Sequence, residues 1–231
     1  MGVLISFCGP DGVGKTTMYR MLKHVFQLYA KIYKVDYVWL RSPHTFAFIL
    51  YNFYRKIGYA RPILKTKVSK YLWIYIEFVS ILPKLIMILI KQLCTKRIII
   101  AERYLLDSIV TILVYFVRDI SFMNSLPIRF LLLVSFKSVT KGKTVFICLD
   151  ADEKTIIERR TKRLSDTDIH LLVPIIREKI RPYIVVQRIM YRKLVKYLGG
   201  FIVDNTEKTP IDTLHEVLTI LNKVYKWELI L

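Results

Sequence analysis

The chain has 231 residues, of which 54% are hydrophobic and 24% charged, so it can pack an α/β domain and is not intrinsically disordered. Its net charge of +19 favours polyanionic partners, namely nucleotides, nucleic acid or an anionic membrane surface, without choosing among them. Three widely spaced cysteines, with no CxxC motif or Cys/His cluster, argue against a disulfide framework or a zinc site. Each cysteine lies in an apolar stretch, which predicts a buried free thiol.

Short apolar runs alternate along the chain with longer segments of helical periodicity. Five runs predict buried strands, at residues 3–8, 35–40, 97–101, 144–149 and 201–203. Helical patterns cover residues 18–32, 45–57, 68–93, 104–117, 128–137, 152–163, 174–197 and 209–225. The last begins at a clear signal, with Thr209 as N-cap, Pro210 next and Asp212 three residues after the cap. We therefore expect a three-layer α/β fold, with a five-stranded parallel sheet flanked by helices, in one domain over residues 1–231.

The segment 72–93, LWIYIEFVSILPKLIMILIKQL, is long and apolar enough to span a bilayer. It also contains Glu77, Lys84 and Lys91, which are costly in hydrocarbon, and Pro83 in its middle. We therefore predict a long, kinked and mostly buried helix. The alternative, attachment of an exposed apolar face to a membrane surface, stays open because the chain is strongly basic.

Residues 9–17, GPDGVGKTT, match the phosphate-binding pattern G-x-x-x-x-G-K-[ST] without a mismatch. Glycines in the loop let the backbone fold around phosphates with its N–H groups inward, and the following helix adds its positive N-terminal end. Lys15 supplies a cation for the β- and γ-phosphates, and the hydroxyl of Thr16 can ligate Mg²⁺. The motif follows an apolar strand and opens an amphipathic helix, so the sequence predicts a site for ATP with Mg²⁺.

Several motifs together resemble the thymidylate kinase family over essentially the whole chain. The P-loop has the family's Asp-Gly pair, and the third strand continues as IIIAERYLLDS, similar to the family's Asp-Arg-Tyr signature followed by a serine. Residues 149–163, LDADEKTIIERRTKR, are similar to the family's strand and the arginine pair that opens its lid. The second strand ends in LRSP, a weak echo of the family's Arg-Glu-Pro. The resemblance implies a P-loop kinase fold with an acceptor-binding helical region at about 41–95 and a lid at about 159–172.

On the donor side, the resemblance implies that ATP is bound by the loop residues Gly9, Pro10, Asp11, Gly12, Val13, Gly14, Lys15, Thr16 and Thr17. Mg²⁺ would be held by Thr16 and, through a water, by Glu102, which replaces the family's aspartate. Gly12 stands where some members have a P-loop arginine. The positive charge that stabilises the transferred phosphoryl group would then come from Lys15 and from Arg159 and Arg163 of the lid. A solvated basic helix face is the alternative for the two arginines.

On the acceptor side, Arg103 would bind the acceptor phosphate and act in catalysis at the carboxyl edge of the sheet, where ligands of α/β proteins bind. Arg41 would be a second phosphate contact, and Asp11 would hold the 3′-hydroxyl of the acceptor sugar. Phe78 would stack on the acceptor base. Its helix lacks the arginine with which the family reads a pyrimidine, so we expect loose selectivity among monophosphates.

The sequence therefore predicts ATP-dependent phosphoryl transfer to a nucleoside monophosphate, with thymidylate as the first candidate. Two alternatives stay open: a P-loop kinase acting on another, membrane-proximal acceptor, and a nucleotide-binding interaction protein with little turnover. No nucleic-acid-binding motif occurs, so we do not expect nucleic acid as a partner. The apolar helices at 104–117 and 128–137 would suit a homodimer. The N-terminal segment lacks the features of a signal peptide, so we expect a cytoplasmic protein, with peripheral membrane contact left open.

Overall fold

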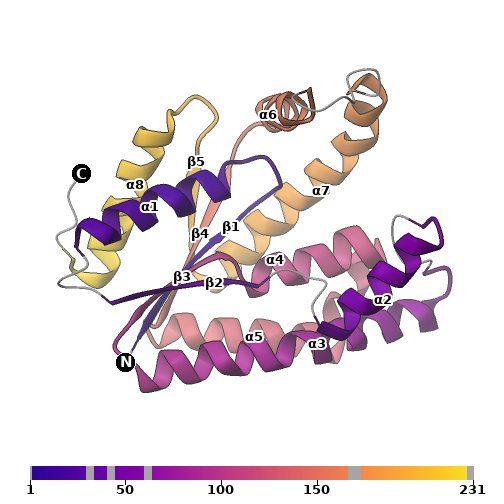
Figure 1. Ribbon diagram of the computed structural model, residues 1–231, viewed down its shortest axis with the longest axis horizontal. Coiled ribbons are helices and arrows are strands. Elements are labelled where there is room, and N and C mark those ends of the chain that lie inside the picture. The colour runs from indigo at the N-terminus through magenta and orange to yellow at the C-terminus, as the bar shows by residue number, and fades with distance from the viewer. Residues whose placement is uncertain (1, 30–33, 41–44, 60–63, 166–172, 228–231) are drawn as a thin grey trace. The chain divides into compact units, whose positions relative to one another are not determined.

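The computed structural model describes residues 2–29, 34–40, 45–59, 64–165 and 173–227, apart from the side chains of residues 163–165 and 173–180. Five strands form one parallel sheet in the order β2-β3-β1-β4-β5, flanked by helices (Figure 1). The strands are β1 (Val3–Cys8), β2 (Val35–Trp39), β3 (Ile98–Arg103), β4 (Thr144–Asp150) and β5 (Phe201–Asp204). Each predicted strand is confirmed to within two residues at its ends, and so is the predicted fold class.

The chain divides into two compact units, which we describe separately. The first contains Met1–Leu4 and Asp36–Thr144, and the second contains Ile5–Val35 and Val145–Leu231. The expected acceptor-binding region at 41–95 falls in the first unit, whereas the P-loop and the expected lid fall in the second. That the whole chain acts as one kinase domain stays a prediction.

The first unit is mostly helical. Its α-helices are α2 (Thr45–Lys56), α3 (Lys67–Cys94), α4 (Leu105–Val110) and α5 (Leu126–Thr140). A π-helical segment, η1 (Thr111–Val117), continues α4, and a 3₁₀ segment, η2 (Ile120–Asn124), precedes α5. The long helix α3 packs against α2, α5 and η1. The predicted helical segment at 104–117 is therefore confirmed, with α-helical hydrogen bonding to Val110 and π-helical hydrogen bonding beyond it, a difference that apolar spacing does not show.

Helix α3 begins at a capping box formed by Thr66 and Ser69 and continues through Pro83. Among the described helices it alone is long and apolar enough to cross a membrane, and 39% of its most apolar window is buried. Trp73 and Glu77 lie inside the unit, while large apolar side chains such as Leu72 and Ile90 are exposed. The prediction of a mostly buried helix is thus wrong, because α3 has an outward apolar face as well as an inward one.

The second unit holds the remaining helices: α1 (Lys15–Leu28), α6 (Glu153–Ser165), α7 (Val173–Leu198) and α8 (Pro210–Tyr225). Helix α1 packs against α8, α6 against α7, and both α7 and α8 contact β5. The strands β4 and β5 run parallel, with Asp150 beside Asp204 at their carboxyl ends. The predicted start of α8 is confirmed, since Thr209 and Asp212 form a capping box and Pro210 follows the cap.

The three cysteines are free thiols. Cys8 and Cys148 are buried, as predicted, but Cys94 is exposed at the end of α3. The prediction for Cys94 is wrong because the apolar sequence around it belongs to the exposed face of that helix.

Candidate functional site

The phosphate-binding motif occupies the turn between β1 and α1 in the second unit. Gly9 has a φ of 136°, and a Cβ at this position would lie 2.1 Å from the backbone oxygen of Leu149 in β4. Gly12 has a φ of 105°, and its Cβ would lie 3.1 Å from the backbone oxygen of Ile156 in α6. A side chain at position 9 would therefore collide with β4, and one at position 12 would be strained by the positive φ and would need the backbone of α6 to move slightly.

Lys15, the first residue of α1, is buried within this loop, with 4% of its side chain exposed. Its Nζ donates hydrogen bonds to the backbone oxygens of Gly9, at 2.5 Å, and Pro10, at 2.9 Å. The carboxylate of Asp11 lies 3.8 Å from the same nitrogen. The loop carbonyls and Asp11 thus hold the ammonium group inside the loop and away from bulk water, and its binding of phosphate stays a prediction.

A pocket of about 320 Å³ lies beside the loop, entirely within the second unit. It is lined by Gly12, Val13, Gly14, Thr17, Met18, Arg159, Asn205, Lys208, Pro210 and Thr213. The pocket combines loop backbone, the start of α1, one arginine of α6 and the connection between β5 and α8. Its volume lies at the lower end of the range for small-molecule sites, roughly 300–1,000 Å³.

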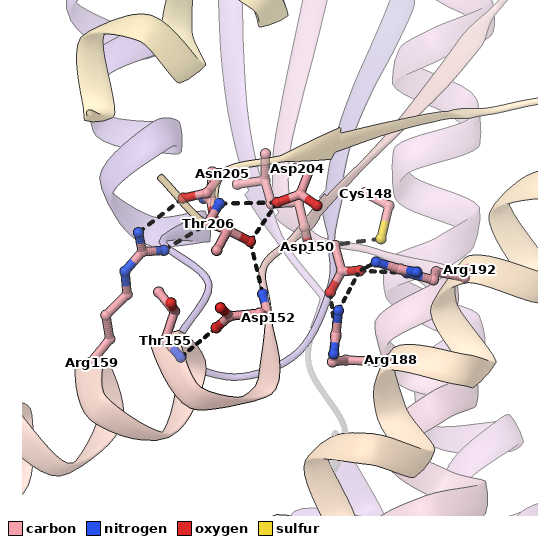
Figure 2. Close-up of polar contacts among 11 residues, drawn as sticks. Cys148, Asp150, Asp152, Thr155, Arg159, Arg188, Arg192, Asp204, Asn205 and Thr206 are labelled. Atoms are coloured by element: carbon pink, nitrogen blue, oxygen red, sulfur yellow. Dashed lines mark hydrogen bonds and ion pairs between the residues drawn. The ribbon is translucent and has the colours of Figure 1, made fainter. Parts of the chain in front are cut away.

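Asn205, directly after β5, joins the loop to α6 (Figure 2). Its side-chain Nδ2 donates a hydrogen bond of 2.7 Å to the backbone oxygen of Val13. Arg159 donates two hydrogen bonds of 3.0 Å each, one to the side-chain oxygen and one to the backbone oxygen of Asn205. Sequence reasoning missed this asparagine, because its role depends on a contact between segments far apart along the chain. Arg159 also lines the pocket, and its predicted catalytic role stays a prediction.

Arg160, the neighbour of Arg159 on α6, lies against the loop. Its Cβ is 3.6 Å from the Cβ position built on Gly12. Its Nη1 is buried and has no hydrogen-bond partner in the part of the chain that the structure describes. A buried guanidinium nitrogen without a partner is costly, and an anion in the loop would relieve that cost. The helix α6 thus places two arginines near the P-loop, Arg159 hydrogen-bonded to Asn205 and Arg160 with a buried nitrogen that has no partner among the described residues.

The start of α6 is fixed by Asp152. Its carboxylate accepts a 2.5 Å hydrogen bond from the backbone N–H of Thr155, as an N-cap does. Its own N–H donates to the hydroxyl of Thr206, which in turn donates to Asp204 (Figure 2). The hydrogen bonds from Thr155 lower the pKa of Asp152 below its usual 3.8. This cap holds the helix that carries Arg159 and Arg160.

A second group that sequence reasoning missed lies at the end of β4. Asp150 is buried, and its carboxylate accepts hydrogen bonds from Arg188, with Nε at 2.9 Å, and from Arg192 (Figure 2). Burial lowers the pKa of Arg188, but the hydrogen bond and charge of Asp150 outweigh it and raise the pKa overall. The i, i+4 spacing of the two arginines was the available signal. Together they attach α7, the helix after the expected lid, to the strand beside the P-loop.

Of the predicted acceptor residues, Phe78 and Arg103 lie in the first unit and Asp11 lies in the second. Arg103 and Glu102 end β3 and are half-buried, and the backbone oxygen of Arg103 accepts a 3.0 Å hydrogen bond from the N–H of Leu40. Phe78 is half-buried and its ring packs edge-on against Phe130 of α5, with centroids 5.5 Å apart. Phe78 and Arg103 stay candidates for acceptor binding.

Part of the predicted site lies outside the described residues. This holds for Arg41, for the side chain of Arg163, and for residues 166–172 of the expected lid. Thr16 is half-buried at the start of α1, where its hydroxyl could ligate Mg²⁺, and Thr17 lines the pocket. Among the described residues, His, Cys, Asp and Glu side chains form no cluster of three or more that could hold a metal by themselves.

Comparison with known proteins supports the fold. No protein-family model matches the chain, and no curated protein matches its sequence. Among solved structures, a deoxyadenosine kinase from M. mycoides with bound dATP matches 95% of this chain and 100% of its own, with a TM-score of 0.53 and 18% sequence identity. The thymidylate kinase family stays a prediction. The chain has the P-loop kinase fold, with a five-stranded parallel sheet flanked by helices.

Proposed function

We propose that this chain is a kinase that passes the γ-phosphoryl group of ATP to a nucleoside monophosphate, with thymidylate as the first candidate. The observation that supports this best is the pairing, in the second unit, of a loop that encloses Lys15 with an adjacent pocket of about 320 Å³. The loop would hold the phosphates of ATP, and the pocket would receive its base and sugar. Arg159 and Asn205 would form the pocket wall nearest the loop.

Charge compensation at the transferred group would come from α6. Because Arg159 is engaged by Asn205, its guanidinium would position the donor and keep the loop in place. Arg160, with its buried and unpartnered Nη1 beside Gly12 among the described residues, would face the phosphates instead. Arg163 remains a further candidate for this role. In such chemistry the protein mainly aligns the two phosphates and neutralises charge, so no covalent intermediate is needed.

The chain has two oxygen donors of the kind that Mg²⁺ prefers, Thr16 in the second unit and Glu102 in the first. A hydroxyl directly after the P-loop lysine and a carboxylate at the end of a neighbouring strand are hard oxygen donors, which Mg²⁺ prefers. Thr16 would be the direct ligand, and Glu102 would act through water. The ion would bridge phosphate oxygens and reduce their negative charge.

A nucleoside is the second candidate acceptor. The match to a deoxyadenosine kinase over nearly the whole chain favours it. In a nucleoside kinase the acceptor group is a hydroxyl of the sugar, whereas in a monophosphate kinase it is a phosphate oxygen. The presence of Arg103 at the end of β3 favours the monophosphate, because an arginine there suits an acceptor phosphate.

One experiment separates these proposals: ADP release from MgATP, measured with the full chain across thymidylate, uridylate, cytidylate and the corresponding nucleosides. We expect turnover with monophosphates and modest discrimination, within about two-hundredfold, because an apolar pocket discriminates weakly. Turnover confined to nucleosides would favour the second candidate. ATP binding without ADP release on any acceptor of this panel would contradict transfer to pyrimidine monophosphates and nucleosides.

A further inference from the structure

Helix α2 carries its large apolar side chains on the outside. The exposed fractions are 61% for Phe46, 66% for Ile49 and 59% for Phe53, and Leu50 and Ile57 are also exposed. Positions 46, 49, 50 and 53 recur at the spacing of one helix face, and Ile57 follows directly after the end of α2 at Lys56. We call these five residues the α2 outer stripe. An apolar face of helical period normally points into a core, so a stripe of this kind that faces solvent indicates a partner.

The opposite face of α2 packs against other residues of the first unit. Ala47 is fully buried, and its N–H donates a 3.0 Å hydrogen bond to the hydroxyl of Ser80 in α3. Thr45 donates to the backbone oxygen of Ser80 at 3.1 Å, and the ring of Tyr51 packs edge-on against Phe116. These contacts fix the rotation of the helix. The outer stripe therefore cannot turn inward without breaking them.

The sequence on both sides of α2 is basic. Residues 37–76 contain no Asp or Glu and seven Lys or Arg, namely Arg41, Arg55, Lys56, Arg61, Lys65, Lys67 and Lys70, of which Lys70 is paired with Asp119 at 3.1 Å. Arg55 and Lys56 are exposed in the last turn of α2, and Lys56, three residues after Phe53, lies beside the outer stripe. Two copies of such a surface would repel each other. An anionic surface complements it, and the combination of aromatic and basic side chains is typical of helices that lie in a lipid interface.

We propose that the α2 outer stripe binds the surface of an anionic lipid bilayer. The phenyl rings and aliphatic side chains enter the boundary between headgroups and acyl chains, while Arg55 and Lys56 contact the headgroup phosphates. The protein lies on the membrane and does not span it. The long helix α3 is packed along its inner face, with Glu77 fully buried, so it is not free to enter hydrocarbon alone. This inference does not depend on the proposed kinase activity.

The test is co-sedimentation of the full chain with vesicles of phosphatidylcholine alone or of phosphatidylcholine with phosphatidylserine. We expect binding to the anionic vesicles that weakens as salt rises. The double variant Phe46→Ser/Phe53→Ser should lower the partition coefficient between vesicles and water by about tenfold or more. It removes the two phenyl rings that would enter the bilayer. Arg55→Glu/Lys56→Glu should abolish the preference for phosphatidylserine.

Two matched variants serve as controls. Leu28→Ser removes an apolar side chain that is 82% exposed on α1, and Lys193→Glu/Lys196→Glu makes the same charge change on α7. Both should bind anionic vesicles as the wild type does, with circular dichroism melts confirming that every variant is folded. Absence of vesicle binding by the wild type, or wild-type binding by the α2 variants, would overturn the proposal. So would a homodimer, seen by light scattering, that Phe46→Ser/Phe53→Ser dissociates while vesicle binding is unchanged.

Discussion

Arg159 of α6 contacts Asn205 at two points, one on the side chain and one on the backbone, each at 3.0 Å. The same asparagine donates to the backbone oxygen of Val13 in the P-loop, so one residue connects the loop, the connection after β5 and the helix that begins the expected lid. A change in the loop conformation on nucleotide binding would thus act on α6 through the contacts of Asn205.

Replacing Asn205 by aspartate separates its two contacts. The new carboxylate would keep an acceptor for Arg159 but would oppose the oxygen of Val13 with another oxygen, where Nδ2 now donates at 2.7 Å. We expect Asn205→Asp to weaken ATP binding by about tenfold or more, because a buried polar atom loses its partner. Titration calorimetry with ATP measures it, with the exposed Asn124→Ala as control. Unchanged ATP affinity would mean that the asparagine does not hold the loop in its binding conformation.

Lys15→Ala should remove phosphoryl transfer and leave the chain folded. The side chain is buried in the loop and donates to the main-chain oxygens of Gly9 and Pro10, and its loss takes away the cation at the phosphates. The check is ADP release together with a thermal melt. Arg20→Ala, an exposed cation on the same helix, should keep wild-type turnover. Normal turnover in Lys15→Ala would contradict the kinase proposal.

The two neighbouring arginines of α6 should respond differently to substitution. Arg160→Ala should lower kcat by about a thousandfold or more with a small effect on the Kd for ATP, since it removes a charge aimed at the phosphates. Arg159→Ala should mainly raise the Kd for ATP, because it loosens the pocket wall. Lys154→Ala, on the exposed side of α6, is the control, and Arg160→Lys should recover part of the rate. Equal and small effects of both substitutions would mean that α6 presents a solvated basic face.

Arg103→Ala should raise the KM for the acceptor far more than the KM for ATP, because the arginine ends β3 in the first unit and is assigned to the acceptor phosphate. Steady-state kinetics with each substrate varied in turn gives both constants. Arg118→Ala, an exposed arginine of the same unit, should change neither. An effect confined to ATP would reverse the assignment of the two sides.

The cap at Asp152 predicts a pH dependence. Its pKa is lowered in the folded chain by hydrogen bonds from Thr155, so the carboxylate stabilises the fold at pH above its unfolded-state value near 3.8. This contribution is lost as the pH falls through the lower folded-state pKa. Asp152→Ala should therefore lower the melting temperature by a few degrees at neutral pH, and the difference from wild type should close on acidification. A difference that is the same at strongly acidic and neutral pH would show that the carboxylate charge is not responsible.

The sequence by itself determined the elements and the P-loop, because the signals for both are local. Apolar runs and helical spacing located the five strands, and the side chains of Thr209 and Asp212 marked the start of α8 within one helical turn. The glycine pattern and Lys15 likewise lie close together along the chain. The spacing was less informative for Thr111–Val117, where the backbone is π-helical. It was also less informative for α3, because apolar residues occur on both the buried and the exposed face of that helix.

Tertiary structure decided which polar groups meet around the loop. Asn205 and Val13 are 192 positions apart, and Arg188 and Asp150 are 38 apart, so no local pattern pairs them. It also decided that α6 approaches Gly12 with Arg160 while Arg159 is held by Asn205, although both are adjacent arginines in the sequence. The direction of the α2 outer stripe was decided in the same way. Periodicity shows that a helix has an apolar face, but only the contacts of Ala47 and Tyr51 show that this face points away from the protein.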